Sequence, residues 1–139
     1  MDKRPEAHFK KPKMEHTEIK HHLFSETLKT SLSIANNMAR KYTNSNSYTY
    51  IDLFAGSGKF KDDSKGSPLI GVDIAANHLK HEINVFHEIN LIFIEKNKQN
   101  ADKLKENVKL ELKKHNLRNL KAILSSFLCK FFLFLKNGK

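Results

Sequence analysis

The chain has 139 residues, which suits a single domain, and its one cysteine excludes an internal disulfide framework and a cysteine-cluster metal site. Its 25 Lys and Arg residues outnumber its 15 Asp and Glu residues, and the net charge of +10 makes nucleic acid a candidate partner. No apolar stretch approaches the roughly 20 residues that a membrane-spanning helix needs, so we expect no membrane contact and a cytoplasmic location.

The first two segments are predicted to be a charged arm and a helix. Residues 1–16 are charged, contain proline and offer little to pack, so we expect a disordered arm; this start also lacks the hydrophobic core of a secretory signal. Residues 17–41 have the spacing of an amphipathic helix. The apolar side expected for this helix contains Ile19, Leu23, Leu28, Ile34 and Met38.

The first predicted strand leads into two closely spaced glycines. Aromatic and branched residues here are typical of a strand that is buried on both faces, namely Tyr48, Tyr50, Ile51, Leu53 and Phe54. Gly56 and Gly58 allow a tight turn and let a ligand approach backbone N–H groups. Because an unpaired buried carboxylate is costly, we expect Asp52 to face a ligand cation or to orient the glycine turn. A pocket for a nucleotide-type ligand is the first hypothesis.

A phosphate-binding P-loop is an alternative interpretation of the same stretch. That loop needs Gly-x-x-x-x-Gly-Lys-Ser/Thr. Aligning Gly58-Lys59 on the pattern places Leu53 at the first glycine and Phe60 at the magnesium-binding hydroxyl. Both differences remove groups that a P-loop needs, so the sequence disfavours a nucleoside-triphosphatase.

A polar loop and a second helix follow the glycine turn. Residues 60–66 form the loop, and Ser67-Pro68 has the pattern of a helix N-cap followed by proline in the first turn. We expect this helix to end within residues 77–84. The next strand, 91–94, places Glu95 farther from the glycines than the about 20 residues of a dinucleotide-binding fingerprint.

Glu95 stands where the second strand ends. A carboxylate at this position accepts hydrogen bonds from both hydroxyls of a ribose. A surface glutamate that opens the next helix, favoured there by the helix dipole, is the alternative. Taken together with Asp52, Gly56 and Gly58, the pattern favours the ribose role. We therefore expect the glycine turn and Glu95 to bind opposite ends of one adenosyl ligand.

Three motifs together resemble the three-Cys-motif partner family, TcmP. They are the Asp-Leu-Phe-Ala-Gly-Ser-Gly of 52–58, the Gly-Ser-Pro-Leu of 66–69 and the Phe-Ile-Glu-Lys-Asn of 93–97, and the resemblance covers about residues 17–124. It implies an α/β fold with a Rossmann-like parallel sheet of the class I methyltransferase type, and S-adenosylmethionine (SAM) as cofactor. The cofactor-binding residues that it implies are Asp52, Phe54, Ala55, Gly56, Gly58 and Glu95. It further implies a partner protein with three clustered cysteines, of the iron–sulfur or radical-SAM kind.

Residues 98–121 have the pattern of a lysine-rich helix. Its expected apolar side consists of Ala101, Leu104, Val108 and Leu112. Interspersed acidic residues, including Glu106 and Glu111, indicate a solvated surface. Contact with nucleic-acid phosphates is the alternative, and it would depend strongly on salt. No histidine spacing typical of a metal site is present in the sequence, so we predict none.

The last segment differs from the family. A third strand is expected over 120–124, followed by serines instead of the acid or amide that usually meets the adenine. Residues 125–139 are apolar and rich in phenylalanine, and we interpret them as an out-of-family, truncated tail. Because the catalytic half of a methyltransferase sheet is not visible, we nominate no catalytic residue. We interpret the chain as a truncated TcmP-like protein that is inactive alone. A noncatalytic partner or nucleic-acid-binding subunit, with this half as a scaffold, is the alternative.

Overall fold

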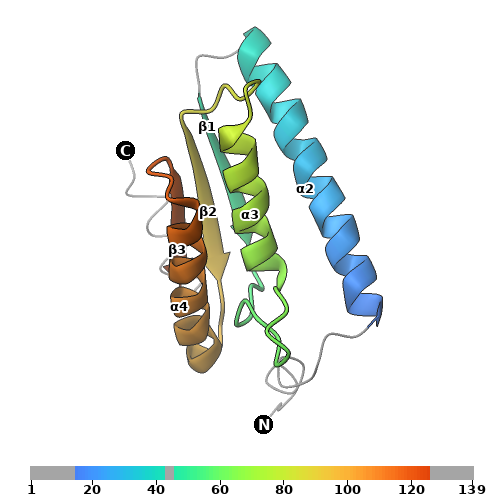
Figure 1. Cartoon of the computed structure of the whole chain (residues 1–139), viewed down its shortest axis with the longest axis vertical. Coiled ribbons are helices and arrows are strands. Elements are labelled where there is room, and N and C mark those ends of the chain that lie inside the picture. Colours follow the sequence, from blue (N-terminus) through green and yellow to red (C-terminus); the bar gives the residue numbers. More distant parts are fainter. Residues whose placement is uncertain (1–14, 43–45, 126–139) are drawn as a thin grey trace.

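The computed structural model describes residues 15–42 and 46–125, which form three helices and a parallel three-stranded sheet (Figure 1). In chain order the elements are α2 (Glu15–Tyr42), β1 (Ser47–Asp52), α3 (Ser67–Lys80), β2 (Glu88–Ile94), α4 (Lys98–His115) and β3 (Leu120–Ser125). The strand order in the sheet is β1-β2-β3. The predicted alternation of helices and parallel strands is therefore confirmed. The predictions for the arm and for the tail beyond Ser125, with Cys129, lie outside the described residues.

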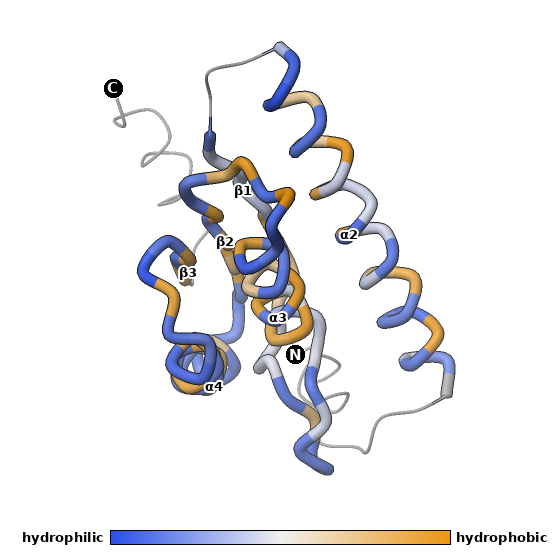
Figure 2. The backbone as a smooth tube through the Cα atoms, turned by 45° about the horizontal axis from the view of Figure 1, so that its top comes forward, coloured by the Kyte–Doolittle hydropathy of each residue, from blue (hydrophilic) through white to orange (hydrophobic). Residues whose placement is uncertain are grey.

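The helices cover one face of the sheet, and the core lies between them and the strands (Figure 1). Every second strand residue joins this core, which in β2 means Ile89, Leu91 and Phe93. Figure 2 shows that α3 is largely hydrophobic and α4 largely hydrophilic. This difference fits the position of α3, which packs against both neighbouring helices and the sheet. The register pairs Asp52 with Phe93 and Phe93 with Leu124, so the carboxyl ends of all three strands meet at one edge.

The opposite face of the sheet carries no helix within the described ranges 15–42 and 46–125. Ile92 and Ile94 form a separate buried pair there, while Ile51 is 41% and Ile123 is 39% exposed. The prediction that the first strand is buried on both faces is wrong, because β1 is an edge strand whose residues alternate between exposed and half-buried. Phe54, just beyond this strand, is 86% exposed.

Helix α2 buries a different stripe from the one predicted. Leu28 is buried as expected, but the other four residues of the expected apolar side, Ile19, Leu23, Ile34 and Met38, are exposed. The stripe that faces the core instead includes Leu32 and Asn36, which are buried, and Phe24, which is half-buried. The Phe24 ring packs on Tyr50, and the Asn36 amide donates to Ile83 O at 2.9 Å and accepts from Val85 N–H at 2.9 Å. These partners on β1 and before β2 select the stripe that faces the core.

Two helix boundaries also differ from the predictions. Gly66, and not Ser67, is the N-cap of α3, because the Ser67 hydroxyl already lies in the first turn and donates to Asp52 Oδ2 at 3.3 Å. Helix α3 ends at Lys80, within the predicted range. Helix α4 ends at His115 and does not reach 121, since Asn116 adopts a left-handed conformation with φ of 52°.

Candidate functional site at the carboxyl ends of the strands

The turns after β1 and β2 share one carboxylate. The Gly56 N–H donates to Glu95 Oε2 at 2.8 Å, and the Asn97 N–H donates to Glu95 Oε1 at 2.7 Å. Gly56 has a φ of 67°, which favours glycine. Glu95 is therefore fixed beside the glycine turn, at the sheet edge where parallel α/β proteins bind their ligands.

Asp52 holds the start of the same turn. Its Oδ1 accepts from the Phe54 N–H at 2.9 Å, and its Oδ2 accepts from the Ser67 hydroxyl at 3.3 Å. Burial raises the pKa of Asp52, and the negative charge of Glu95 raises it further, although the two hydrogen bonds act in the opposite direction. Two carboxylates thus lie close enough at the strand ends to interact electrostatically, which favours a cation between or beside them.

The other predicted residues play different parts in this turn. Ala55 is buried and donates its N–H to Ile94 O at 3.1 Å, whereas the Phe54 side chain is exposed. Gly58 has a φ of 82°, and a Cβ on it would lie 2.9 Å from Leu104 Cδ1. Packing against α4 therefore explains the second glycine, where the sequence suggested ligand approach. The structure brings Asp52, Gly56 and Glu95 together and directs Gly58 toward the helices.

Two cavities lie near the carboxyl ends of the strands, one beside Glu95 and one beside the glycine turn. The one beside Glu95 has a volume of about 120 Å³ and is lined also by Phe93, Leu124 and Ser125. Ligand pockets usually have roughly 300 Å³ or more, so this cavity is too small for a whole nucleoside. The other, of about 380 Å³, lies between the loop after Gly58 and the first turns of α4. Its lining includes the basic and amide side chains of Lys59, Lys61, Gln99, Asn100, Lys103 and Asn107.

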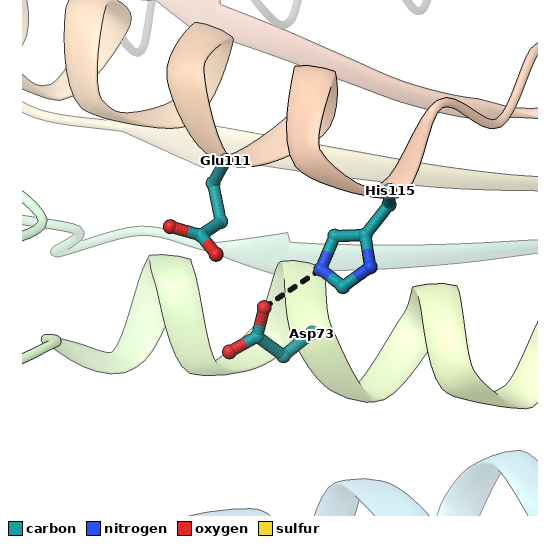
Figure 3. Close-up of side chains that lie close together, drawn as sticks. All are labelled: Asp73, Glu111 and His115. Carbon is teal, nitrogen blue, oxygen red and sulfur yellow. Dashed lines mark hydrogen bonds and ion pairs between the residues drawn. The ribbon is translucent and has the colours of Figure 1, made fainter.

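An ion-pair network that the sequence analysis missed joins the loop before α3 to the helices. Lys65 Nζ contacts Asp73 Oδ2 at 2.5 Å and Glu111 Oε1 at 2.7 Å, and His115 Nε2 lies 2.8 Å from Asp73 Oδ1. Figure 3 shows the α4 side chains of Glu111 and His115 pointing toward Asp73 on α3. The expectation that Glu111 lies on a solvated surface is wrong, because it is only 2% exposed. The one local sequence signal for this network was the spacing of Glu111 and His115, which places them one helical turn apart.

This network has the composition of a metal site, but a lysine takes part in it. Ligand atoms of Asp73, Glu111 and His115 lie within 4.8 Å of one another. The Lys65 ammonium contacts both carboxylates and supplies the positive charge that they require. Burial opposes ionisation of Glu111, yet hydrogen bonds from Lys65 and Lys114 outweigh it and lower the pKa of Glu111 to about 2. The arrangement is a structural clamp.

The P-loop alternative gains no support from the geometry. Phe60 is buried and offers no hydroxyl for magnesium. Lys59 Nζ lies 3.8 Å from Asp63 Oδ1 and lines the larger cavity, whereas Glu95 lines the smaller one.

Comparison of the chain with known protein families, with curated proteins and with solved structures found no match in any of the three. Among the helices described, none is both long and apolar enough to cross a membrane.

Proposed function

We propose that residues 17–124 are the SAM-binding half of a TcmP-like methyltransferase with a Rossmann-like sheet, and that this chain alone is inactive. The observation that carries the proposal is the hydrogen bond from the Gly56 N–H to the Glu95 carboxylate at 2.8 Å. It places the acid of the second strand directly beside the glycine turn of the first. The TcmP resemblance adds a three-cysteine-motif protein, of the iron–sulfur or radical-SAM kind, as the proposed partner.

The chemistry of the two carboxylates suits the two ends of SAM. Each Glu95 oxygen accepts one backbone hydrogen bond and retains a lone pair for a ribose hydroxyl. The negative charge of Asp52 lies near that of Glu95 and favours the positively charged amino-acid end of the cofactor. SAM supplies an already activated methyl group, so the remaining task of the protein is to position it and exclude water.

Three features argue for weak binding of SAM by this chain. The cavity beside Glu95 measures about 120 Å³, and Ser125 occupies the place where an acid or amide is usual in such enzymes. The outer edge of β1 pairs with no strand in the described part of the chain. A ligand that lies across the strand ends is thus held from one side, and we expect a dissociation constant on the order of 1 mM.

Calorimetric titration with a ligand series tests the proposal without altering the protein. We expect heat with SAM and with adenosine, less with 2′-deoxyadenosine and 3′-deoxyadenosine, and none with magnesium ATP. The deoxy analogues report on the carboxylate, because each removes one hydroxyl that Glu95 would accept from. Equal heats for adenosine and both deoxy analogues would contradict the ribose role, and heat with magnesium ATP alone would favour a phosphate site.

A pair of matched variants locates the site. Glu95→Gln replaces one accepting oxygen by an amide donor, so binding of SAM should fall at least about tenfold. Glu82→Gln, at an exposed position between α3 and β2, makes the same chemical change away from the strand ends and should leave binding unchanged. Far-UV circular dichroism of both variants separates loss of the site from loss of the fold.

A second candidate function, nucleic-acid binding, is favoured by the larger cavity. Lys59, Lys61 and Lys103 line it, and the Asn100 side-chain amide, which is buried at its rim, has no hydrogen-bond partner among the described residues. The opposing carboxylates of Asp63 and Glu106 also line it, so the charge excess there is small. Lys103 lies in the first turns of α4, within the lysine-rich segment suggested by the sequence, whereas Lys59 and Lys61 belong to the loop between β1 and α3.

Salt dependence decides between the two functions. If RNA phosphates bind at this cavity, replacing Lys61 and Lys103 by alanine should lower the salt slope of RNA binding by about 1 for each lysine. Lys80→Ala serves as control, because Lys80 is an exposed lysine at the C-terminal end of α3, far along the helix from the loop that lines the cavity. RNA binding without this difference would reflect net charge alone.

A further inference from the structure

The face of the sheet opposite the helices divides into a polar and an apolar half. The register aligns Thr49, Asn90 and Lys121 in one row across the three strands. The next row on the same face, toward the carboxyl ends, consists of Ile51, Ile92 and Ile123, which we call the isoleucine row. Ile92 in the middle of this row is buried, whereas Ile51 and Ile123 at its two ends are 41% and 39% exposed. The two ends would gain from a partner, because branched apolar side chains gain most when they are buried on both sides.

The chain itself continues from the apolar end of this face. β3 ends at Ser125, which the register aligns with Ile94, one step beyond the isoleucine row on the same face. The apolar residues that follow are Phe127, Leu128, Phe131, Phe132, Leu133, Phe134 and Leu135. We propose that segment 126–139 docks on the isoleucine row and Ile94, and so covers the second face of the sheet.

The reach of this segment is sufficient in any conformation. Neighbouring strands lie about 4.8 Å apart, so the row from β3 to β1 spans about 10 Å. Fourteen residues span about 21 Å even when helical, and more when extended. A tethered segment also has an effective concentration in the millimolar range, which favours it over a second copy of the chain. The proposal is independent of whether SAM binds at the strand ends.

The single native cysteine, Cys129, lies in this segment and provides a direct test. The variant Ile51→Cys places a second cysteine on β1, the strand farthest from the start of the segment. Lys105→Cys, at an exposed position on α4, is the matched control, because Lys105 lines one cavity together with Ser125 and so lies near the start of the segment on the helix side of the sheet. Both variants are treated at low protein concentration with a short bismaleimide, and the products are identified by non-reducing gel and peptide mass.

Docking predicts that, in the Ile51→Cys variant, an intramolecular link joins the introduced thiol to Cys129. This link should form at least about tenfold faster than the link in the Lys105→Cys control. Cys129→Ser in the Ile51→Cys background should abolish it. Equal rates at the two positions would overturn the proposal, since an undocked segment would reach both. A predominance of linked dimers would also overturn it and would assign the face to a second copy.

Thiol reactivity gives a second measurement on the otherwise native chain. Ile51→Asp introduces a charge into the proposed contact and should raise the labelling rate of Cys129 by an aromatic disulfide reagent about tenfold. Ile34→Asp should leave that rate unchanged. An unchanged rate in Ile51→Asp, with the circular dichroism of the fold retained, would contradict docking at this row.

Discussion

Replacement of Glu111 by glutamine tests the clamp between the loop before α3 and helix α4. Glu111 is buried and accepts from Lys65 Nζ at 2.7 Å and from Lys114 Nζ at 2.9 Å. A lowering of its pKa from 4.5 to about 2 corresponds to about 3 kcal/mol of stability at neutral pH, since each pH unit is worth about 1.4 kcal/mol. Glutamine keeps the shape and removes the charge, so the variant should lose about this amount.

The same reasoning fixes the pH dependence. Because the folded-state pKa is depressed, the contribution is fully present above about pH 4.5 and is lost as the pH falls toward about 2. The difference between native protein and Glu111→Gln in urea unfolding should therefore be largest at neutral pH, at about 3 kcal/mol, and should shrink steadily as the pH falls below about 4.5. Glu106→Gln, an exposed position on the same helix, should change stability by less than about 0.5 kcal/mol. A loss below about 1 kcal/mol in Glu111→Gln that does not vary with pH would refute the clamp.

Three further substitutions address the glycine turn and helix α3, each measured by urea unfolding. Gly58→Ala should destabilise by about 1–3 kcal/mol, because φ is 82° and the new Cβ would lie 2.9 Å from Leu104; no loss would mean that the turn relaxes freely. Gly71→Ala, inside α3, should stabilise by about 0.5–1 kcal/mol, since its Cβ would have its nearest contacts at 3.8 and 3.9 Å; a loss would reveal tighter packing against α2. Asp52→Asn should stabilise the fold at neutral pH, because burial raises the pKa of Asp52 and its charged form therefore costs stability above that pKa. The cost disappears as Asp52 is protonated at lower pH, so the gain from the substitution should disappear too. A gain that persists in acid would contradict this cause.

Local signals in the sequence were sufficient for the order of elements. Apolar runs ending in glycine or in a polar cap identify strands and helix starts, and parallel strands joined by helical crossovers bring their carboxyl ends together. The meeting of Gly56 and Glu95 follows from that rule alone. The prediction that the first strand is buried on both faces was wrong, because the position of β1 at the sheet edge depends on the whole topology.

Long-range partners explain the remaining errors. The periodicity of α2 permits more than one apolar stripe, and its contacts with Tyr50 and Ile83 select between them. Lys65 and Glu111 are far apart in the sequence, so no local pattern indicates their ion pair. The reason for a glycine at position 58 was ambiguous on similar grounds, because the contact that requires it is made by Leu104 on a later helix.

The Glu95 carboxylate accepts hydrogen bonds from two backbone amides, and its fixed position affects the binding entropy of any ligand at the carboxyl ends of the strands. The orientation of its remaining lone pairs is set before the encounter, so little conformational freedom is surrendered there on association. The entropy cost of ordering falls instead on the ligand. Conformationally rigid nucleosides should therefore bind more tightly than flexible ones of the same composition.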